Sequence, residues 1–144
     1  MKTSQRPPKG KKFYTVEQAN AMLPLLTRIL RDITELMQDL HQRYERIAHL
    51  QHSGSSTEAH SEETRTLVAE FERDQERMHE FEAELKQLDV ELKDHFTGLI
   101  DFPCWQDDRE IYLCWRLGEP AVAHWHELDS GFAGRQRLNQ AKSR

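Results

Sequence analysis

Two histidines close together near the C-terminal end of the chain have the spacing that suits metal binding. His124 and His126 are two residues apart in a segment expected to be a β-strand, so their imidazoles share one face of it. Two imidazoles on one face can bind one zinc, iron or manganese ion. We expect a third ligand from Asp101, His95 or Glu127, although Glu127 needs a bulge to reach that face. The alternative is that both histidines bond to backbone at a sheet edge.

The predicted strand pairing decides whether a thiol can join these histidines. A four-residue loop at 118–121 places Trp115 opposite His124, which puts Cys114 on the other face of the sheet. A slip of one residue would bring Cys114 to the same face as the histidines. Two cysteines, Cys104 and Cys114, are too few for a disulfide framework, so we expect free thiols and a cytoplasmic protein.

A glycine-rich segment follows the histidines and offers a second kind of chemistry. Gly131 and Gly134 can present backbone N–H groups to an anion, with Arg135 and Arg116 supplying positive charge. The segment lacks the lysine and hydroxyl of a nucleotide-binding loop. The alternative is that the glycines only allow a tight turn.

Long helices are expected to carry these residues. Thr15 and Gln18 form a capping-box pattern, and apolar residues then recur every seven positions at Leu26, Ile33, Leu40 and Ile47. Pro24 lies within this series and predicts a kink without a break. A matching series, Phe71, Met78 and Leu85, predicts an antiparallel, coiled-coil-like hairpin over residues 13–88, with a polar tip near 51–66.

A small antiparallel β-module is predicted over residues 89–136. Strands are expected at 99–102, where Pro103 ends the strand, at 111–117 and at 122–128. Helices followed by strands give an α+β fold. Basic tails, expected to be disordered, cover residues 1–12 and 137–144, and the body between them is acidic, so nucleic-acid binding is unlikely.

Several strings of residues resemble a bacterial family of unknown function, domain-of-unknown-function family 2203. The strings are Phe13–Asn20 with Leu23–Pro24, Gly98–Pro103, Leu113–Pro120 and Trp125–Gln136. The resemblance covers nearly the whole chain. It implies a bacterial cytoplasmic protein and supplies no activity or catalytic residue.

Composition narrows the remaining classes of function. The chain has 144 residues, of which 37% are hydrophobic and 31% charged, and no apolar run approaches the length of a bilayer crossing, so no membrane span is predicted. No pattern indicates a catalytic triad. The leading hypothesis is a non-enzymatic protein-interaction module, binding an unknown protein partner and forming a homodimer through its helices. The alternative is a metal-binding protein or metal-dependent enzyme with a divalent transition metal on His124 and His126.

Overall fold

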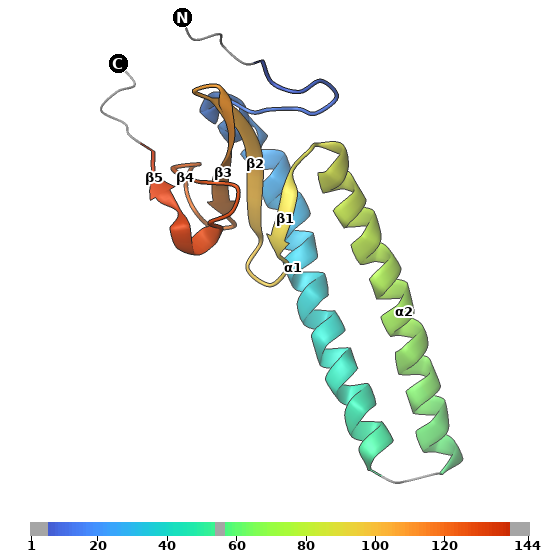
Figure 1. Ribbon diagram of the computed structural model, residues 1–144. Coiled ribbons are helices and arrows are strands. Elements are labelled where there is room, and N and C mark those ends of the chain that lie inside the picture. The colour runs from blue at the N-terminus through green and yellow to red at the C-terminus, as the bar shows by residue number, and fades with distance from the viewer. Residues whose placement is uncertain (1–5, 54–56, 139–144) are drawn as a thin grey trace, which may run out of the picture.

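The computed structural model describes residues 6–53 and 57–138. Two long helices lie side by side and are followed by a five-stranded antiparallel sheet (Figure 1). The predicted α+β fold, a helical hairpin carrying a small sheet, is confirmed.

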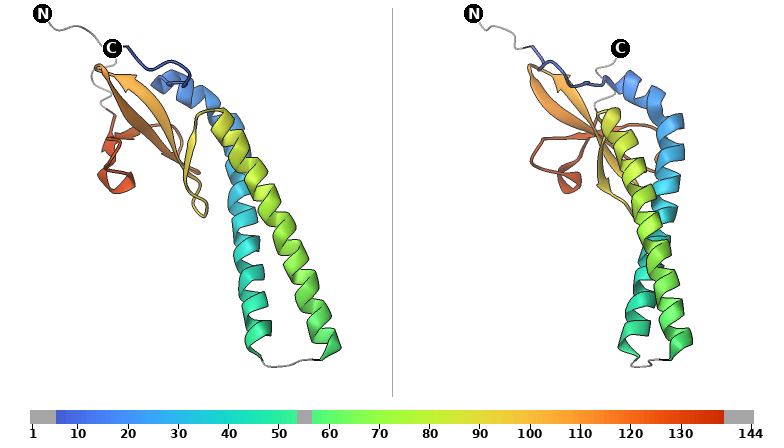
Figure 2. Two further views of the ribbon diagram at one scale, coloured as in Figure 1. Left: turned by 45° about the vertical axis from the view of Figure 1, so that its right-hand side comes forward. Right: turned by 90° about the vertical axis from the view of Figure 1, so that its right-hand side faces the viewer.

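Helix α1 spans Val16–His52 and begins at the predicted capping box. The Gln18 N–H donates to Thr15 Oγ1 at 3.1 Å, and the Thr15 N–H donates to Gln18 Oε1 at 3.0 Å. These two bonds satisfy backbone donors that the first turn leaves free. The helix continues through Pro24, as predicted, and its first turns lie at an angle to the rest (Figure 2).

Helix α2 spans Glu58–Gln87 and returns antiparallel to α1. Residues 58–66, which we expected in the polar tip, therefore form its first turns. The seven-residue series meet in the seam, where Leu26, Ile33 and Leu40 of α1 are buried and Met78 and Leu85 of α2 are buried. Asp74, which interrupts the second series, accepts a hydrogen bond from Arg43 across the seam.

The strands form a meander in which sequence order is also spatial order. Their bounds are β1 Glu91–Asp94, β2 Leu99–Gln106, β3 Arg109–Arg116, β4 His124–His126 and β5 Gln136–Arg137. A 3₁₀ turn, Phe132–Gly134, lies between β4 and β5. Lys11 and Lys12, in the predicted N-terminal tail, contact the sheet end through Glu110 and Asp89.

Strand β2 runs through Pro103, so the prediction that this proline ends the strand is wrong. The carbonyl oxygen of Pro103 accepts a hydrogen bond from the Tyr14 N–H at 2.7 Å, while Pro103 is paired in register with Tyr112 of β3. In a strand the N and O of one residue point to the same side. The missing N–H of Pro103 therefore faces away from β3, where the ladder needs no donor.

The pairing of β3 with β4 differs by one residue from the predicted register. Cys114 lies opposite His124, and Tyr112 lies opposite His126. The connection between β3 and β4 covers residues 117–123, and in it the Val122 N–H donates to the side chain of Asn20 in α1, at 2.8 Å. This bond ties the returning chain to the helix.

The inner face of the sheet packs against the base of the hairpin. Ile100, Phe102, Leu113 and Trp115 belong to one apolar cluster with the residues of α1 and α2. Gly98 lies between β1 and β2 at φ +71°, and a Cβ there would lie 2.9 Å from Leu117 Cβ. Only glycine fits this turn without strain.

Candidate functional site

Ionisable side chains form one row across the outer face of the sheet. Register places Glu91, Asp101, Cys114, His124 and Arg137 opposite one another on successive strands. This row lies on the face opposite the apolar cluster, because neighbouring residues of a strand point to opposite faces. The sheet therefore has an apolar inner face and a row of chemically active groups outside.

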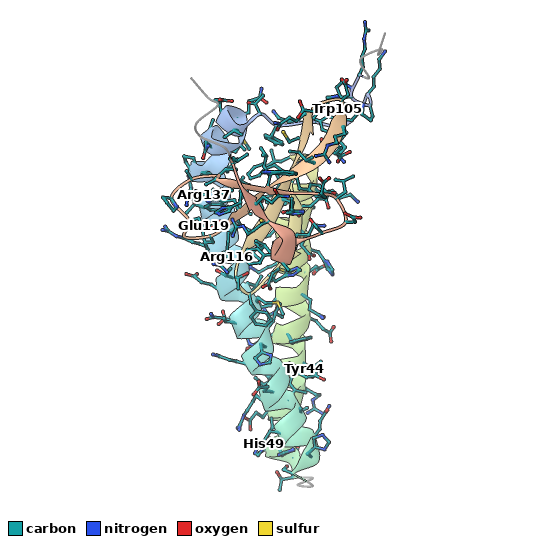
Figure 3. All side chains as sticks on the ribbon, turned by 60° about the vertical axis from the view of Figure 1, so that its left-hand side comes forward. Tyr44, His49, Trp105, Arg116, Glu119 and Arg137 are labelled. Atoms are coloured by element: carbon teal, nitrogen blue, oxygen red, sulfur yellow. The ribbon has the colours of Figure 1, made fainter. Side chains whose placement is uncertain are left out.

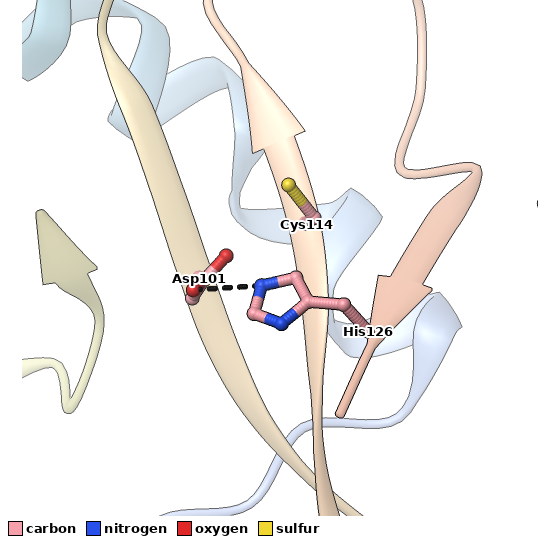
Figure 4. Close-up of side chains that lie close together, drawn as sticks. All are labelled: Asp101, Cys114 and His126. Carbon is pink, nitrogen blue, oxygen red and sulfur yellow. Dashed lines mark hydrogen bonds and ion pairs between the residues drawn. The ribbon is translucent and has the colours of Figure 1, made fainter. Parts of the chain in front are cut away.

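Three of the outer-face residues form a buried cluster. Asp101 on β2, Cys114 on β3 and His126 on β4 each offer one ligand atom, and these atoms lie within 4.8 Å of one another (Figure 4). His126 Nε2 is 2.9 Å from Asp101 Oδ2. Asp101 and His126 are each 2% exposed and Cys114 is fully buried. Buried charged groups need close partners, which this cluster supplies.

The hydrogen bonds of His126 fix where its protons lie. Its Nδ1 is 2.7 Å from the backbone oxygen of Glu127, which can only accept, so Nδ1 carries a proton. One further proton lies between Nε2 and Asp101 Oδ2, because two bare acceptors would repel. The pair therefore has no net charge, as an imidazolium with a carboxylate or as an imidazole with a carboxylic acid.

Burial raises the pKa of both other groups of the cluster, Asp101 and Cys114. Burial raises the pKa of Asp101, and the hydrogen bond from His126 only partly offsets this. Burial and the neighbouring Asp101 raise the pKa of Cys114 to about 12, so it is a thiol at neutral pH. Asp101 Oδ1 is buried and has no hydrogen-bond partner among the described residues.

His124 and His126 both lie on the outer face, as predicted, but only His126 belongs to the buried cluster. His124 Nδ1 accepts a hydrogen bond from Arg135 Nη2 at 2.8 Å, away from the cluster. Burial, together with the charge of Arg135, lowers the pKa of His124. Glu127 forms an ion pair with Arg109. Asp101 and His126 thus meet, and Cys114 takes the place expected of His124 and Glu127.

The positive charge of Arg135, in the predicted anion site, is paired with the carboxylate of Glu119. Arg135 Nη2 donates to Glu119 Oε1 at 3.0 Å, and the guanidinium lies 4.6 Å from the Phe132 ring centroid. Arg116 lies over the same ring, at 5.2 Å. Gly131 takes a φ of +63° before the 3₁₀ turn, so it has the role of a turn residue. Figure 3 labels Arg116 and Arg137 on the sheet and Glu119 in the connection between β3 and β4.

Comparison with known proteins gives the family of the chain. It belongs to the family of uncharacterized conserved proteins DUF2203, whose model matches residues 12–138. No curated protein and no solved structure matches significantly. Of the helices in the described part of the chain, none combines the length and apolar character that a bilayer crossing needs.

The sequence contained a signal for Cys114 that the predicted register concealed. Asp101 and His126 were candidates from their residue types alone. With Cys114 paired to His124, the same alternation places the thiol beside both of them. Register, not residue type, was the missing information.

Proposed function

We propose that the protein is a non-enzymatic interaction module that binds a second copy of itself through its distal arm. The distal arm is the part of the hairpin made of residues 41–52 and 58–77. It extends away from the sheet, and Tyr44 and His49 lie on it (Figures 1 and 3). The observation that carries the proposal is the small number of buried side chains in the distal arm. Leu50 is the only buried side chain in these two ranges, both of which the structure describes.

The exposed contacts between the two distal helices contribute little stability on their own. Arg46 pairs with Glu63 at 2.8 Å, but the side chains are 51% and 46% exposed. Such surface pairs contribute about 0–1 kcal/mol. The ring centroids of Tyr44 and Phe71 are 6.3 Å apart, yet Tyr44 remains 62% exposed. An exposed tyrosine beside a second aromatic is the kind of residue that anchors protein interfaces.

Charge favours another copy of the chain as the occupant. Residues 58–77 contain seven acidic and three basic residues, whereas residues 41–52 contain one acid, two arginines and three histidines. A two-fold axis would place α1 of each protomer beside α2 of the other, so that the unlike ranges face each other. The product is a four-helix bundle, which buries the faces that one hairpin leaves open.

Light scattering after size-exclusion chromatography tests the proposal. At several hundred micromolar we expect twice the 17.0 kDa mass of the chain. Tyr44→Glu is expected to shift the protein to monomer, because it puts a charge in the proposed interface. Leu128→Glu, at a 51% exposed apolar residue outside the helices, is the matched control and is expected to remain dimeric. A wild-type monomer at this concentration refutes the proposal.

A cytoplasmic location is part of the same proposal. Cys104 and Cys114 are both buried and free, which suits a reducing compartment. Cys104 has its pKa raised to about 11 by burial, so neither thiol is poised to react at neutral pH.

A further inference from the structure

We propose that Asp101, Cys114 and His126 bind one divalent transition-metal ion, with zinc as the best match to the donor set. This site differs from the predicted one, because Cys114 replaces His124 and Glu127 as a ligand. The three ligands are one thiolate, one imidazole and one carboxylate, all of which zinc accepts. They come from three adjacent strands, so the sheet itself fixes their separation.

The distances between the three candidate ligand atoms are close to those between the ligands of a bound zinc ion. Ligand atoms at tetrahedral zinc, with bonds of about 2.0–2.3 Å, lie roughly 3.5 Å apart. The three candidate atoms lie within 4.8 Å of one another, and the His126–Asp101 contact is 2.9 Å. Shifts of about 1 Å in the ligand atoms would reduce separations of up to 4.8 Å to the roughly 3.5 Å of a zinc site.

The surroundings of His126 are those of a metal-binding histidine. Its Nδ1–H donates to the Glu127 backbone oxygen, so Nε2 is the nitrogen that faces Asp101 and Cys114. Metal-binding histidines almost always donate their second ring N–H to a carbonyl or carboxylate, which fixes the ring and its tautomer. Asp101 Oδ1, buried and without a hydrogen-bond partner among the described residues, is an acceptor that a cation would serve.

Binding leaves the buried charge unchanged. Without metal, the thiol is neutral and the Asp101–His126 pair shares one proton, so the net charge is zero. Zinc binding removes the thiol proton and the shared proton to solvent, leaving a thiolate, a carboxylate and a neutral imidazole around Zn²⁺. The net charge is again zero, so the ion enters without leaving an uncompensated buried charge. Three protein ligands leave the fourth tetrahedral position for a water or another small ligand.

Cobalt substitution tests the site, because Co²⁺ is spectroscopically visible where Zn²⁺ is not. Untagged full-length protein is unfolded and refolded with one equivalent of Co²⁺, since the ligands are buried. We expect one bound ion and a thiolate-to-cobalt charge-transfer band. Cys114→Ser is expected to lose the band. Cys104→Ser is the matched control, because this second buried cysteine lies on the opposite face of β2 from Asp101, and it is expected to keep the band.

Two further measurements keep the proposal open to refutation. Asp101→Asn retains the size of the side chain, and we expect at least a tenfold loss of Zn²⁺ affinity in a folded protein. Calorimetry in buffers of different ionisation enthalpy is expected to show two protons released per Zn²⁺. Less than a tenth of an equivalent of bound Co²⁺ and Zn²⁺ overturns the proposal and leaves a purely structural His–Asp pair. An unchanged band in Cys114→Ser, or unchanged affinity in Asp101→Asn, overturns it as well.

Discussion

Replacing Asp101 by leucine is expected to destabilise the fold far more than replacing it by asparagine. Leucine is close in size but leaves His126 Nε2 buried, 2% exposed, without its partner. Removing one member of a buried pair costs about 3–5 kcal/mol. In a domain of this size that corresponds to a fall in melting temperature of about 10–15 °C.

Asparagine separates the loss of a hydrogen bond from the loss of charge. Its amide N–H₂ can donate to a neutral His126 at Nε2, while His126 Nδ1 keeps its bond to the Glu127 oxygen. The exchange then costs about 1 kcal/mol, the difference between a hydrogen bond to a charged group and one between neutral groups. His126→Leu in the Asp101→Leu background removes the orphaned imidazole, and we expect the double variant to be more stable than the two single losses predict by at least 1 kcal/mol.

Urea unfolding with a chelator present measures these differences without metal. Circular dichroism and tryptophan fluorescence follow the helices and the sheet separately, and coincident transitions justify a two-state fit. A loss below 1 kcal/mol for Asp101→Leu, or additive single losses in the double variant, refutes the argument that the pair is mutually dependent.

Two further predictions concern the turns around the sheet. Gly98→Ala is expected to cost about 1–3 kcal/mol of stability from its positive φ, and more from the clash of the new Cβ with Leu117 Cβ. Gly118→Ala, at φ +102° with nothing within 4 Å, is expected to lose only the backbone contribution. Equal losses of stability in urea unfolding would contradict the role of the clash. Burial raises the pKa of Glu119. Hydrogen bonds from Arg135 and from the Arg116 backbone lower this pKa by more than burial raises it, so the net shift is downward. A carboxyl with a lowered pKa in the folded state adds stability above its unfolded pKa, and this stability is lost as the pH falls through the folded pKa. Glu119→Gln is therefore expected to lose up to about 1 kcal/mol at pH 7 and to lose less at acidic pH, which unfolding measured across that pH range will show.

The sequence predicted the hairpin well because its determinants are local. The bonds between Thr15 and Gln18 span three residues, and the apolar series needs only helical periodicity. The existence of strands β2, β3 and β4 and the α+β class followed from local composition in the same way. Pro103 shows the limit, since whether a proline ends a strand depends on what lies beside it, and here that neighbour is Tyr14.

The composition of the buried cluster was only partly predictable, for a similar reason. Asp101 and His126 stood out by residue type, but the inclusion of Cys114 depended on register. The segment that leads into β4 is tied to α1 by a bond from Val122 to Asn20, which are 102 positions apart in the chain. Periodicity carries no information about such a contact, so the thiol was placed on the wrong face.

The meander order of the five strands has a kinetic consequence. Every strand pairs with the one made immediately before or after it, and the two helices are likewise sequence neighbours. Low separation between contacting residues is associated with rapid folding, because short loops cost little entropy to close. We therefore expect the sheet to form one hairpin after another. Each new edge strand is paired with the next strand soon after it forms. The backbone groups of an edge strand are then exposed only briefly to pairing with another chain.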